Sequence, residues 1–413
     1  MKNASMEIAM SELSHISRTA SIAADRNALP AFGFDAPRLD RVRQTIVSDI
    51  EQGHCHGVAM RVARRGTTVL DVCEGYADRA AGTLLQSDSV FASMSVAKQF
   101  TNVLALSLVE QGLLKLHAPV AEVIPEFGTL GKEKVNLYHL LTHTSGVLSA
   151  VPNVPPEVLM NVEAMVEFAC GLPLESQPGE RVNYSLLLGH SIIAAMCLRA
   201  DGRGRRYADM LREDLFEPLR MNDTSLGPRA DLVKRLCPVR VAYENMPSLT
   251  PKEAVEGVGA LLATPGCEIP GGGCMTTIAD VQRFAEMLRQ GGALDGVRVL
   301  SPAMIDFCAR NHTGDMRNVF FDTTCGMRNW MTYPAAIGVG FFVRGDGNLP
   351  GHHFSALHSP NAFGGFGAGC NGFSIDPQRD LTIAFLSTGL MEDSRHLERM
   401  STLATLVLAA IAN

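Results

Sequence analysis

The stretch Phe91-Ala-Ser-Met-Ser-Val-Ala-Lys98 places Ser95 and Lys98 three residues apart at the predicted start of a helix. Residues at this spacing share one helix face, so the Lys98 amine can reach the Ser95 hydroxyl. A serine hydroxyl is a weak nucleophile until a neighbouring base takes its proton. A second stretch, Pro178-Gly-Glu-Arg-Val-Asn-Tyr-Ser185, supplies Tyr184. A lysine partly buried beside a tyrosine can have its pKa lowered enough to be that base, or can pass the proton to a phenolate. The three residues favour an acyl-transferring serine enzyme without a His–Asp pair.

The composition is that of a soluble globular protein with one large domain or two interlocked ones. The 413 residues are 46% hydrophobic and 19% charged, and a chain of this length exceeds the size at which one core stops growing. The net charge of -7, without a basic stripe, argues weakly against nucleic acid as a partner. Ten cysteines without paired CxxC spacing are typical of reduced, mostly buried thiols in a cytosolic protein.

The N-terminal segment gives no signal for export. Residues 1–29 contain Lys2 but no continuous apolar stretch after it, which argues against a signal peptide. The longest apolar runs, 186–197 and 403–410, are too short to span a bilayer. We therefore expect a cytoplasmic protein that has no membrane partner. No feature of the sequence predicts an oligomeric state.

Hydrophobic periodicity predicts a set of helices and strands. Helices are expected over 38–50, from Ser95 to Gly112, from a cap at Thr277 to Gly291, and over 391–410; strands are expected over 57–63, 67–73, 337–343, 371–375 and 381–386. Strands at both ends of the chain, with helices between them, imply that the first and last segments share one antiparallel sheet.

Six segments in a fixed order resemble the serine β-lactamase-like superfamily. They are Ser95-x-x-Lys98 with Gln-Phe-Thr101, Leu140-Leu-Thr-His-Thr-Ser-Gly146, Pro178–Ser185, Phe216-Glu-Pro-Leu-Arg-Met221-Asn-Asp-Thr224, Gly271-Gly-Gly, and Gly291–Pro302. This superfamily includes class C β-lactamases, D-alanyl-D-alanine peptidases, family VIII carboxylesterases and acyltransferases of natural-product biosynthesis. The motif that is often Tyr-x-Asn reads Tyr184-Ser-Leu186 here, and this version resembles the esterase branch more than the β-lactamases. Taken as a whole, the chain resembles family VIII carboxylesterases and related acyltransferases.

The resemblance implies an α/β (α+β) fold, in which an antiparallel sheet flanked by N- and C-terminal helices receives an inserted, mostly helical domain. The expected organisation is a polar leader at 1–36, a sheet domain from 37–85 and 291–413, and a helical domain over 86–290 that carries Ser95, Lys98 and Tyr184. The site is expected in the groove between the two domains, where pockets commonly form.

The third motif of the superfamily departs from its usual form. It normally has Lys or His, any residue, then Gly, shortly before an Asp-Pro turn; the corresponding residues here are Gly365, Phe366 and Gly367, before Asp376-Pro377. The usual cation binds a substrate carboxylate, a charge-assisted contact that glycine does not supply. This argues against β-lactams and C-terminal peptides, and for a neutral ester or thioester. A histidine at 352, 353 or 358 remains an alternative source of the cation.

The resemblance also implies a role for each site residue. Ser95 would form an acyl-enzyme, and Lys98 and Tyr184 would share the general-base and general-acid steps. The backbone N–H groups of Ser95 and Ala368 would form the oxyanion hole. Residues 365–367, Gly-Phe-Gly, would bind the substrate by close backbone approach. No cofactor is implied.

Several other segments resemble functional motifs but are interpreted as structural. His143 is expected to be a hydrogen-bonded scaffold residue. Gly189-His190-Ser191 lacks the final glycine of a nucleophile elbow and lies in an apolar helix. His54-Cys55-His56 and His352-His353 lack zinc-site spacing. Gly271-Gly-Gly273 is not followed by the Lys-Ser/Thr of a phosphate loop.

The leading hypothesis is a serine hydrolase that cleaves a small-molecule carboxylic ester. An acyltransferase that passes the same acyl group to an alcohol or amine comes next. An amidase or peptidase is weakened by the missing cation, and a β-lactamase by the missing export signal. The hypothesis from another class is a non-catalytic protein that keeps the fold as a scaffold. An intact set of Ser95, Lys98 and Tyr184 argues against it.

Overall fold

A computed structural model describes residues 26–243, 251–347 and 352–412. Most of the expected leader, residues 1–25, lies outside the described residues. Its described part forms the short helix η1 (Leu29–Phe32) before α2 (Ala36–Glu51). None of the helices within the described ranges has both the length and the apolar character needed to cross a bilayer.

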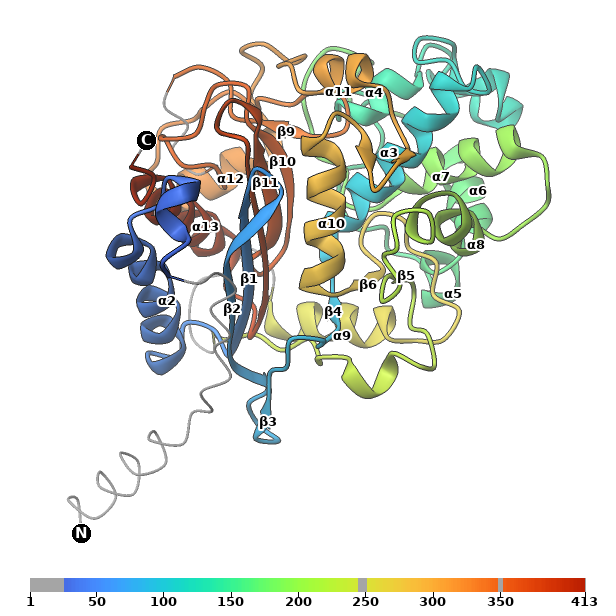
Figure 1. Cartoon of the computed structure of the whole chain (residues 1–413). Coiled ribbons are helices and arrows are strands. Elements are labelled where there is room, and N and C mark those ends of the chain that lie inside the picture. The colour runs from blue at the N-terminus through green and yellow to red at the C-terminus, as the bar shows by residue number, and fades with distance from the viewer. Residues whose placement is uncertain (1–25, 244–250, 348–351, 413) are drawn as a thin grey trace.

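A seven-stranded antiparallel sheet joins the two ends of the chain (Figure 1). Its order is β3 (Thr83–Leu84), β2 (Thr67–Asp78), β1 (Gly57–Arg64), β12 (Leu381–Thr388), β11 (Asn371–Asp376), β10 (Phe363–Gly367) and β9 (Phe342–Val343). Strands β1 and β12 pair along their full length, from Gly57 opposite Thr388 to Arg64 opposite Leu381. This pairing confirms the expectation that the first and last segments share one sheet.

The β1–β2 hairpin forms where the sequence predicts it. Arg65 and Gly66 both have positive φ angles, 53° and 78°, as a two-residue hairpin turn of type I′ requires. The predicted strand over 337–343 is wrong for most of its length, because only Phe342 and Val343 join the sheet. Gly340 has a φ of 84°, which turns the chain instead of extending it.

Helices cover both faces of the sheet. Helix α2 and helix α13 (Asp393–Ala409) pack against each other and cover one face, and α10 (Ile278–Arg289) covers the other (Figure 1). In α2, the Asp35 side chain accepts a hydrogen bond from the Arg38 N–H, and this N-cap starts the helix. The buried α2 residues are Leu39, Val42, Ile46 and Ile50. Their spacing of three and four residues confirms the predicted apolar face.

The middle of the chain is mostly helical and lies beyond α10. Two buried helices, α3 (Ala97–Glu110) and α7 (Leu188–Asp201), pack against each other there. The shorter helices are α4 (Leu137–Leu141), α5 (Pro156–Leu159), α6 (Val162–Cys170), α8 (Tyr207–Leu211), α9 (Lys252–Leu262), α11 (Pro302–Cys308) and α12 (Val319–Arg328). The small strands are β4 (Phe91–Ala92), β5 (Ser225–Leu226) and β6 (Cys274–Thr276) in one sheet, and β7 (Ala293–Leu294) with β8 (Val297–Arg298) in another.

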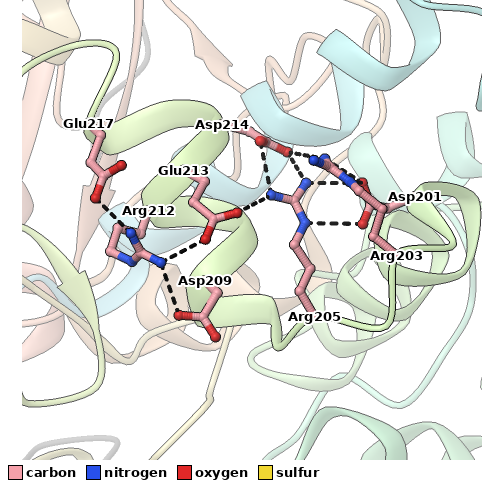
Figure 2. A network of polar contacts seen from close by, with 8 residues as sticks. All are labelled: Asp201, Arg203, Arg205, Asp209, Arg212, Glu213, Asp214 and Glu217. Atoms are coloured by element: carbon pink, nitrogen blue, oxygen red, sulfur yellow. Dashed lines mark hydrogen bonds and ion pairs between the residues drawn. The ribbon is translucent and has the colours of Figure 1, made fainter.

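An ion-pair network ties the end of α7 to α8 and to the following helical turn η5 (Arg212–Phe216) (Figure 2). Arg205 bonds to three carboxylates: Asp201 at 2.9 Å, Glu213 at 2.8 Å, and Asp214. Its side chain is only 11% exposed, and that of Asp201 only 5%. Arg203, which is 60% exposed, contacts two of the same carboxylates. The network therefore has a buried arginine and an exposed one around shared partners.

Candidate active site

Ser95 lies in a single 3-10 turn, Met94–Val96, that leads directly into α3. The preceding residue, Met94, has a φ of 49°, a left-handed conformation that is unfavourable for residues other than glycine. The Ser93 N–H donates to the Cys274 carbonyl at 2.8 Å, which fixes this turn to strand β6. Backbone strain of this kind is typical of functional positions.

The Lys98 side chain is buried, with 1% of its surface exposed. Its Nζ lies 3.2 Å from Ser95 Oγ, and it donates to the carbonyl oxygens of Leu186 at 2.7 Å and Gly271 at 2.6 Å. Burial lowers the pKa of Lys98 to about 7, because the charged form loses its hydration. A neutral amine has two N–H groups and one lone pair. The two carbonyls accept both N–H groups, so the lone pair is left for the Ser95 hydroxyl.

Tyr184 completes the group and is 6% exposed. Its ring centroid lies 5.1 Å from Lys98 Nζ, and its hydroxyl is hydrogen-bonded to Ser95. Burial raises the pKa of Tyr184 well above its usual value of 10, and the bond to Ser95 offsets only part of that rise. The hydroxyl therefore keeps its proton at neutral pH. A hydroxyl in this state can donate a proton, whereas a phenolate base would need the proton to be lost.

His143 holds the segment that carries Tyr184. Its Nδ1 accepts from the Ser185 N–H at 3.2 Å and its carbonyl accepts from the Asn183 N–H at 2.9 Å. The imidazole also packs on the Tyr184 ring, with centroids 4.4 Å apart. Burial, with a smaller contribution from the Lys98 charge, lowers the pKa of His143 to about 3. His143 is thus a neutral, hydrogen-bonded scaffold residue in the structure, as the sequence analysis expected.

Asn318 holds the same segment from the opposite side. Its Oδ1 accepts from the Tyr184 N–H and from the Phe320 N–H, each at 3.3 Å. Asn318 is the N-cap of α12, so the helix cap and the Tyr184 backbone share one acceptor. The half-buried Phe320 ring lies 5.9 Å from the Tyr184 ring. Asn318 was not singled out from the sequence, where its only local signal is a single Asn before a run of three apolar residues.

Strand β10 brings the third motif beside Ser95. A Cβ atom on Gly367 would lie 2.8 Å from the Ser95 nitrogen, so only glycine fits there. Ala368 follows directly after the strand and is exposed. On the other side of β10, strand β9 pairs only with residues 363 and 364. The structure thus brings Ser95, Lys98, Tyr184 and the 365–368 segment together.

Another side chain occupies the space beside Gly365, the third-motif position that has no side chain of its own. A Cβ on Gly365 would overlap the side chain of Gln99, which is 3% exposed. Oriented so that its amide nitrogen donates, Gln99 bonds to the carbonyls of Ser95 and Val96, each at 3.2 Å. Gln99 therefore occupies the space beside Ser95 that a side chain at 365 would enter.

The three histidines considered as replacement cations are buried and neutral. Burial lowers the pKa of His352 to about 3 and that of His358 to about 4, and it lowers that of His353 well below its usual value. The His353 ring packs at a tilt against the Phe366 ring, with centroids 4.9 Å apart. None of these imidazoles carries the charge of the missing lysine at neutral pH.

The other candidate motifs have structural roles. Gly189-His190-Ser191 lies within α7, and His190 Nε2 is 3.1 Å from the Asn102 side-chain oxygen. Gly271 contributes its carbonyl to Lys98, a role that its glycine-rich context did not predict. Across the described ranges, no three His, Cys, Asp or Glu side chains are grouped so that they could hold a metal ion.

Comparison with known proteins places the chain in a family. The sequence profile of the Beta-lactamase family matches residues 42–406, so the chain belongs to that family and is a serine hydrolase of its superfamily. Penicillin-binding protein 4 of Amycolatopsis lactamdurans is 30% identical over 286 residues, 68% of this chain and 72% of that protein. Esterase/beta-lactamase LipL of Mycobacterium tuberculosis is 28% identical over 306 residues, 68% of this chain and 69% of that protein.

Solved structures share the fold over almost the whole chain. A family VIII carboxylesterase superimposes with a TM-score of 0.70 at 21% identity, covering 90% of this chain and 99% of that chain. EstCE1, a hydrolase with promiscuous acyltransferase activity, superimposes with a TM-score of 0.71 at 21% identity, covering 89% and 98%. At these identities the likeness shows the common architecture.

Proposed function

We propose that the protein cleaves a carboxylic ester through an acyl-enzyme on Ser95. The observation that carries this proposal is the contact set of Lys98, whose two N–H groups face carbonyls while its lone pair is left for Ser95 Oγ. With a pKa of about 7, the amine is substantially neutral at physiological pH and can act as a general base. The fold likeness to a family VIII carboxylesterase and the sequence relation to LipL support an ester as substrate.

In the proposed first half-reaction, the Lys98 amine takes the Ser95 proton while Oγ bonds to the ester carbonyl carbon. The carbonyl electron pair moves onto oxygen, and the N–H groups of Ser95 and Ala368 stabilise that charge. When the tetrahedral intermediate collapses, the C–O bond to the alcohol breaks. The departing oxygen takes the Tyr184 proton, which Lys98 replaces. In the second half, water gives a proton to Lys98 and adds to the acyl carbon. The bond from that carbon to Ser95 Oγ then breaks, Oγ takes the proton back from Lys98, and the acid leaves.

The proposed substrate has no carboxylate next to the reacting carbonyl. The position that carries a cation in penicillin-recognising relatives is Gly365, and buried Gln99 fills the adjoining space. The buried histidines nearby are neutral. A neutral ester or thioester therefore fits this site better than a β-lactam or a peptide C-terminus does.

The test is the intact mass of wild type and Ser95→Ala after brief exposure to p-nitrophenyl butyrate. A butyryl increment on wild type alone is the expected result. Decay of that increment in water supports the hydrolase, whereas faster decay with added alcohol or amine supports the acyltransferase.

Two outcomes would contradict the proposal. If wild type gains no mass and releases no p-nitrophenol, the ester reaction is wrong and the non-catalytic scaffold gains support. If both proteins turn over equally, Ser95 is not the nucleophile.

A further inference from the structure

The turn after β10 has an unfavourable backbone. It consists of residues 368–370 and joins β10 to β11, between the paired residues Gly367 and Asn371. Gly369 and Cys370 both have positive φ angles, 77° and 87°. Cys370 has a Cβ atom, so this conformation costs energy there. A turn of this kind persists only when its surroundings hold it.

One set of contacts holds the carbonyl side of the turn. The Ser387 hydroxyl, on β12, lies 2.9 Å from the Gly369 oxygen and 3.1 Å from the Cys370 oxygen. The Asn371 side chain adds a link to the nucleophile segment, because it donates to the Ala92 carbonyl at 3.1 Å. It also accepts from the Ser387 N–H at 3.0 Å. These bonds fix one side of the turn to the sheet.

Within the part of the chain that the structure describes, one side chain holds the N–H side of the turn. The Gly369 N–H donates to Nδ1 of His396 at 3.2 Å, from the first turn of α13. The His396 side chain is buried, with 3% exposure. Burial lowers the pKa of His396 to about 4, although the Glu392 charge raises it. The imidazole is therefore neutral, and its Nδ1 is an acceptor.

The other ring nitrogen of His396 is unsatisfied. Because Nδ1 accepts, the proton is on Nε2, which has no hydrogen-bond partner among the described residues. A buried N–H without a partner destabilises the fold, so an apolar ring would suit simple packing better. The Phe366 ring lies 5.8 Å from the His396 ring, and an apolar side chain at position 396 would pack against it equally well. The bond to Gly369 is thus the specific contribution of an imidazole at this position.

We propose that His396 is a positioning residue that aims the Ala368 N–H at the substrate oxyanion by fixing the adjacent Gly369 N–H. This inference rests on the proposed function, because it needs the acyl-transfer reaction as its readout. Without this bond, the Gly369 N–H has no hydrogen-bond partner among the described residues, and the turn can rotate. Rotation removes one oxyanion donor from the transition state and leaves ground-state binding intact, so the effect falls on kcat.

The test compares two substitutions in the same buried cluster. His396→Phe removes the acceptor and keeps a ring. His352→Phe is the matched control, since His352 is a buried imidazole with neither ring nitrogen hydrogen-bonded within the described residues. Loss of a whole oxyanion donor costs about 10²–10³ in kcat. We expect His396→Phe to lower kcat for p-nitrophenyl butyrate by about 10- to 100-fold with KM within about twofold, and His352→Phe to keep wild-type kcat.

A conservative variant separates positioning from packing. The Oδ1 of His396→Asn can accept from the Gly369 N–H, so this variant is expected to recover most of the kcat lost in His396→Phe. Folding is checked by thermal unfolding, and the shorter His396→Leu replaces His396→Phe if the latter does not fold.

The inference is overturned if His396→Phe keeps wild-type kcat, if the His352→Phe control falls equally, or if KM changes in place of kcat. Wild type serves as the check on the underlying function: if wild type itself forms no acyl-enzyme, the proposed reaction fails, and not the role of His396 alone.

Discussion

The Gln99 side chain fills the space that any side chain at Gly365 would enter. One residue comes from the first turn of α3 and the other from strand β10, so helix and strand fit together only because position 365 has no Cβ. The loss of the third-motif cation is therefore not an isolated change at 365. It is coupled to a buried glutamine whose amide bonds to the Ser95 carbonyl.

Because these two positions are packed together, we predict that a cationic side chain at position 365 fits only when the side chain at position 99 is made smaller. Gly365→Lys alone is expected to lower stability by about 1–3 kcal/mol through overpacking and to gain nothing on charged substrates. Gly365→Lys combined with Gln99→Gly gives the lysine space. The double variant should raise the kcat/KM ratio of p-nitrophenyl hemisuccinate to p-nitrophenyl butyrate about tenfold or more, because a hydrogen bond to a charged group is formed.

The two esters have acyl chains of the same length and differ in the terminal carboxylate, so their ratio reports charge recognition alone. Gln99→Gly alone is the remaining corner of the double-mutant cycle. An equal shift of the ratio in Gly365→Lys and in the double variant would show that Gln99 does not obstruct position 365.

The Lys98 pKa predicts the pH dependence of acylation. The base must be neutral, and its pKa in the folded protein is about 7. Acylation monitored by intact mass should therefore fall about tenfold for each pH unit below 7 and level off above it. Lys98→Arg keeps its proton at every accessible pH and should lose activity by about 10²–10⁴. A flat profile from pH 5 to 8 in wild type would contradict Lys98 as the base.

The same pKa shift predicts how stability changes with pH. An unfolded Lys98 has the usual pKa of 10.5, so between pH 7 and 10.5 the unfolded state binds more protons than the folded state. The free energy of unfolding of wild type, relative to Lys98→Met, should therefore rise with pH across this window. Chemical denaturation at pH 7 and pH 9 measures the difference, and no change between the two would show that the folded lysine stays charged.

The ion-pair network predicts different costs for its two arginines. Arg205→Met leaves the buried Asp201 and its neighbours without their main partner (Figure 2). We expect it to lower the free energy of unfolding by about 1–3 kcal/mol. Arg203→Met, at the exposed position, should have little effect. Urea unfolding compares the two, with kcat unchanged in both. Equal losses of unfolding free energy in the two variants would mean that the burial of an arginine does not determine how much it stabilises the fold.

The stability that the ion-pair network contributes also depends on pH in the acidic range. Burial pushes the pKa of Asp201 up, but hydrogen bonds from Arg205 and Arg203 outweigh it and hold the pKa below 3.8. A carboxyl with a lowered pKa contributes stability that is present above its unfolded pKa and is lost as pH falls through its folded pKa. The stability difference between wild type and Arg205→Met should therefore shrink below about pH 4.

Local patterns in the sequence predicted the elements that local forces determine. The spacing of the α2 apolar residues and the Arg65-Gly66 turn each depend on neighbours a few residues away, and both were confirmed. The strand over 337–343 failed because its apolar composition does not reveal the left-handed turn at Gly340. Strand β10 has three glycines in five residues, so no alternation marks it, and only the family resemblance located it.

The site residues also divide into those that local helix geometry brings together and those that meet only through tertiary packing. Ser95 and Lys98 are three residues apart, and helix geometry alone brings them together. The contacts of Gly271 with Lys98, of Asn318 with Tyr184 and of His396 with Gly369 span 173, 134 and 27 positions. No periodicity or short motif encodes such contacts, because they arise only when distant segments pack.

The pairing of β1 with β12 has a consequence for synthesis of the chain. Arg64, the end of β1, leaves the ribosome long before its partner Leu381, and at about 5–20 residues per second the interval lasts roughly 15–60 s. During that time the hairpin of β1 and β2 presents an unpaired edge, which invites pairing with other chains. Strand β10 and the turn after it are also translated late, so a truncated product contains Ser95 without the strand that lies beside it. Nascent chains should thus be catalytically silent and should depend on chaperones until the last strand emerges.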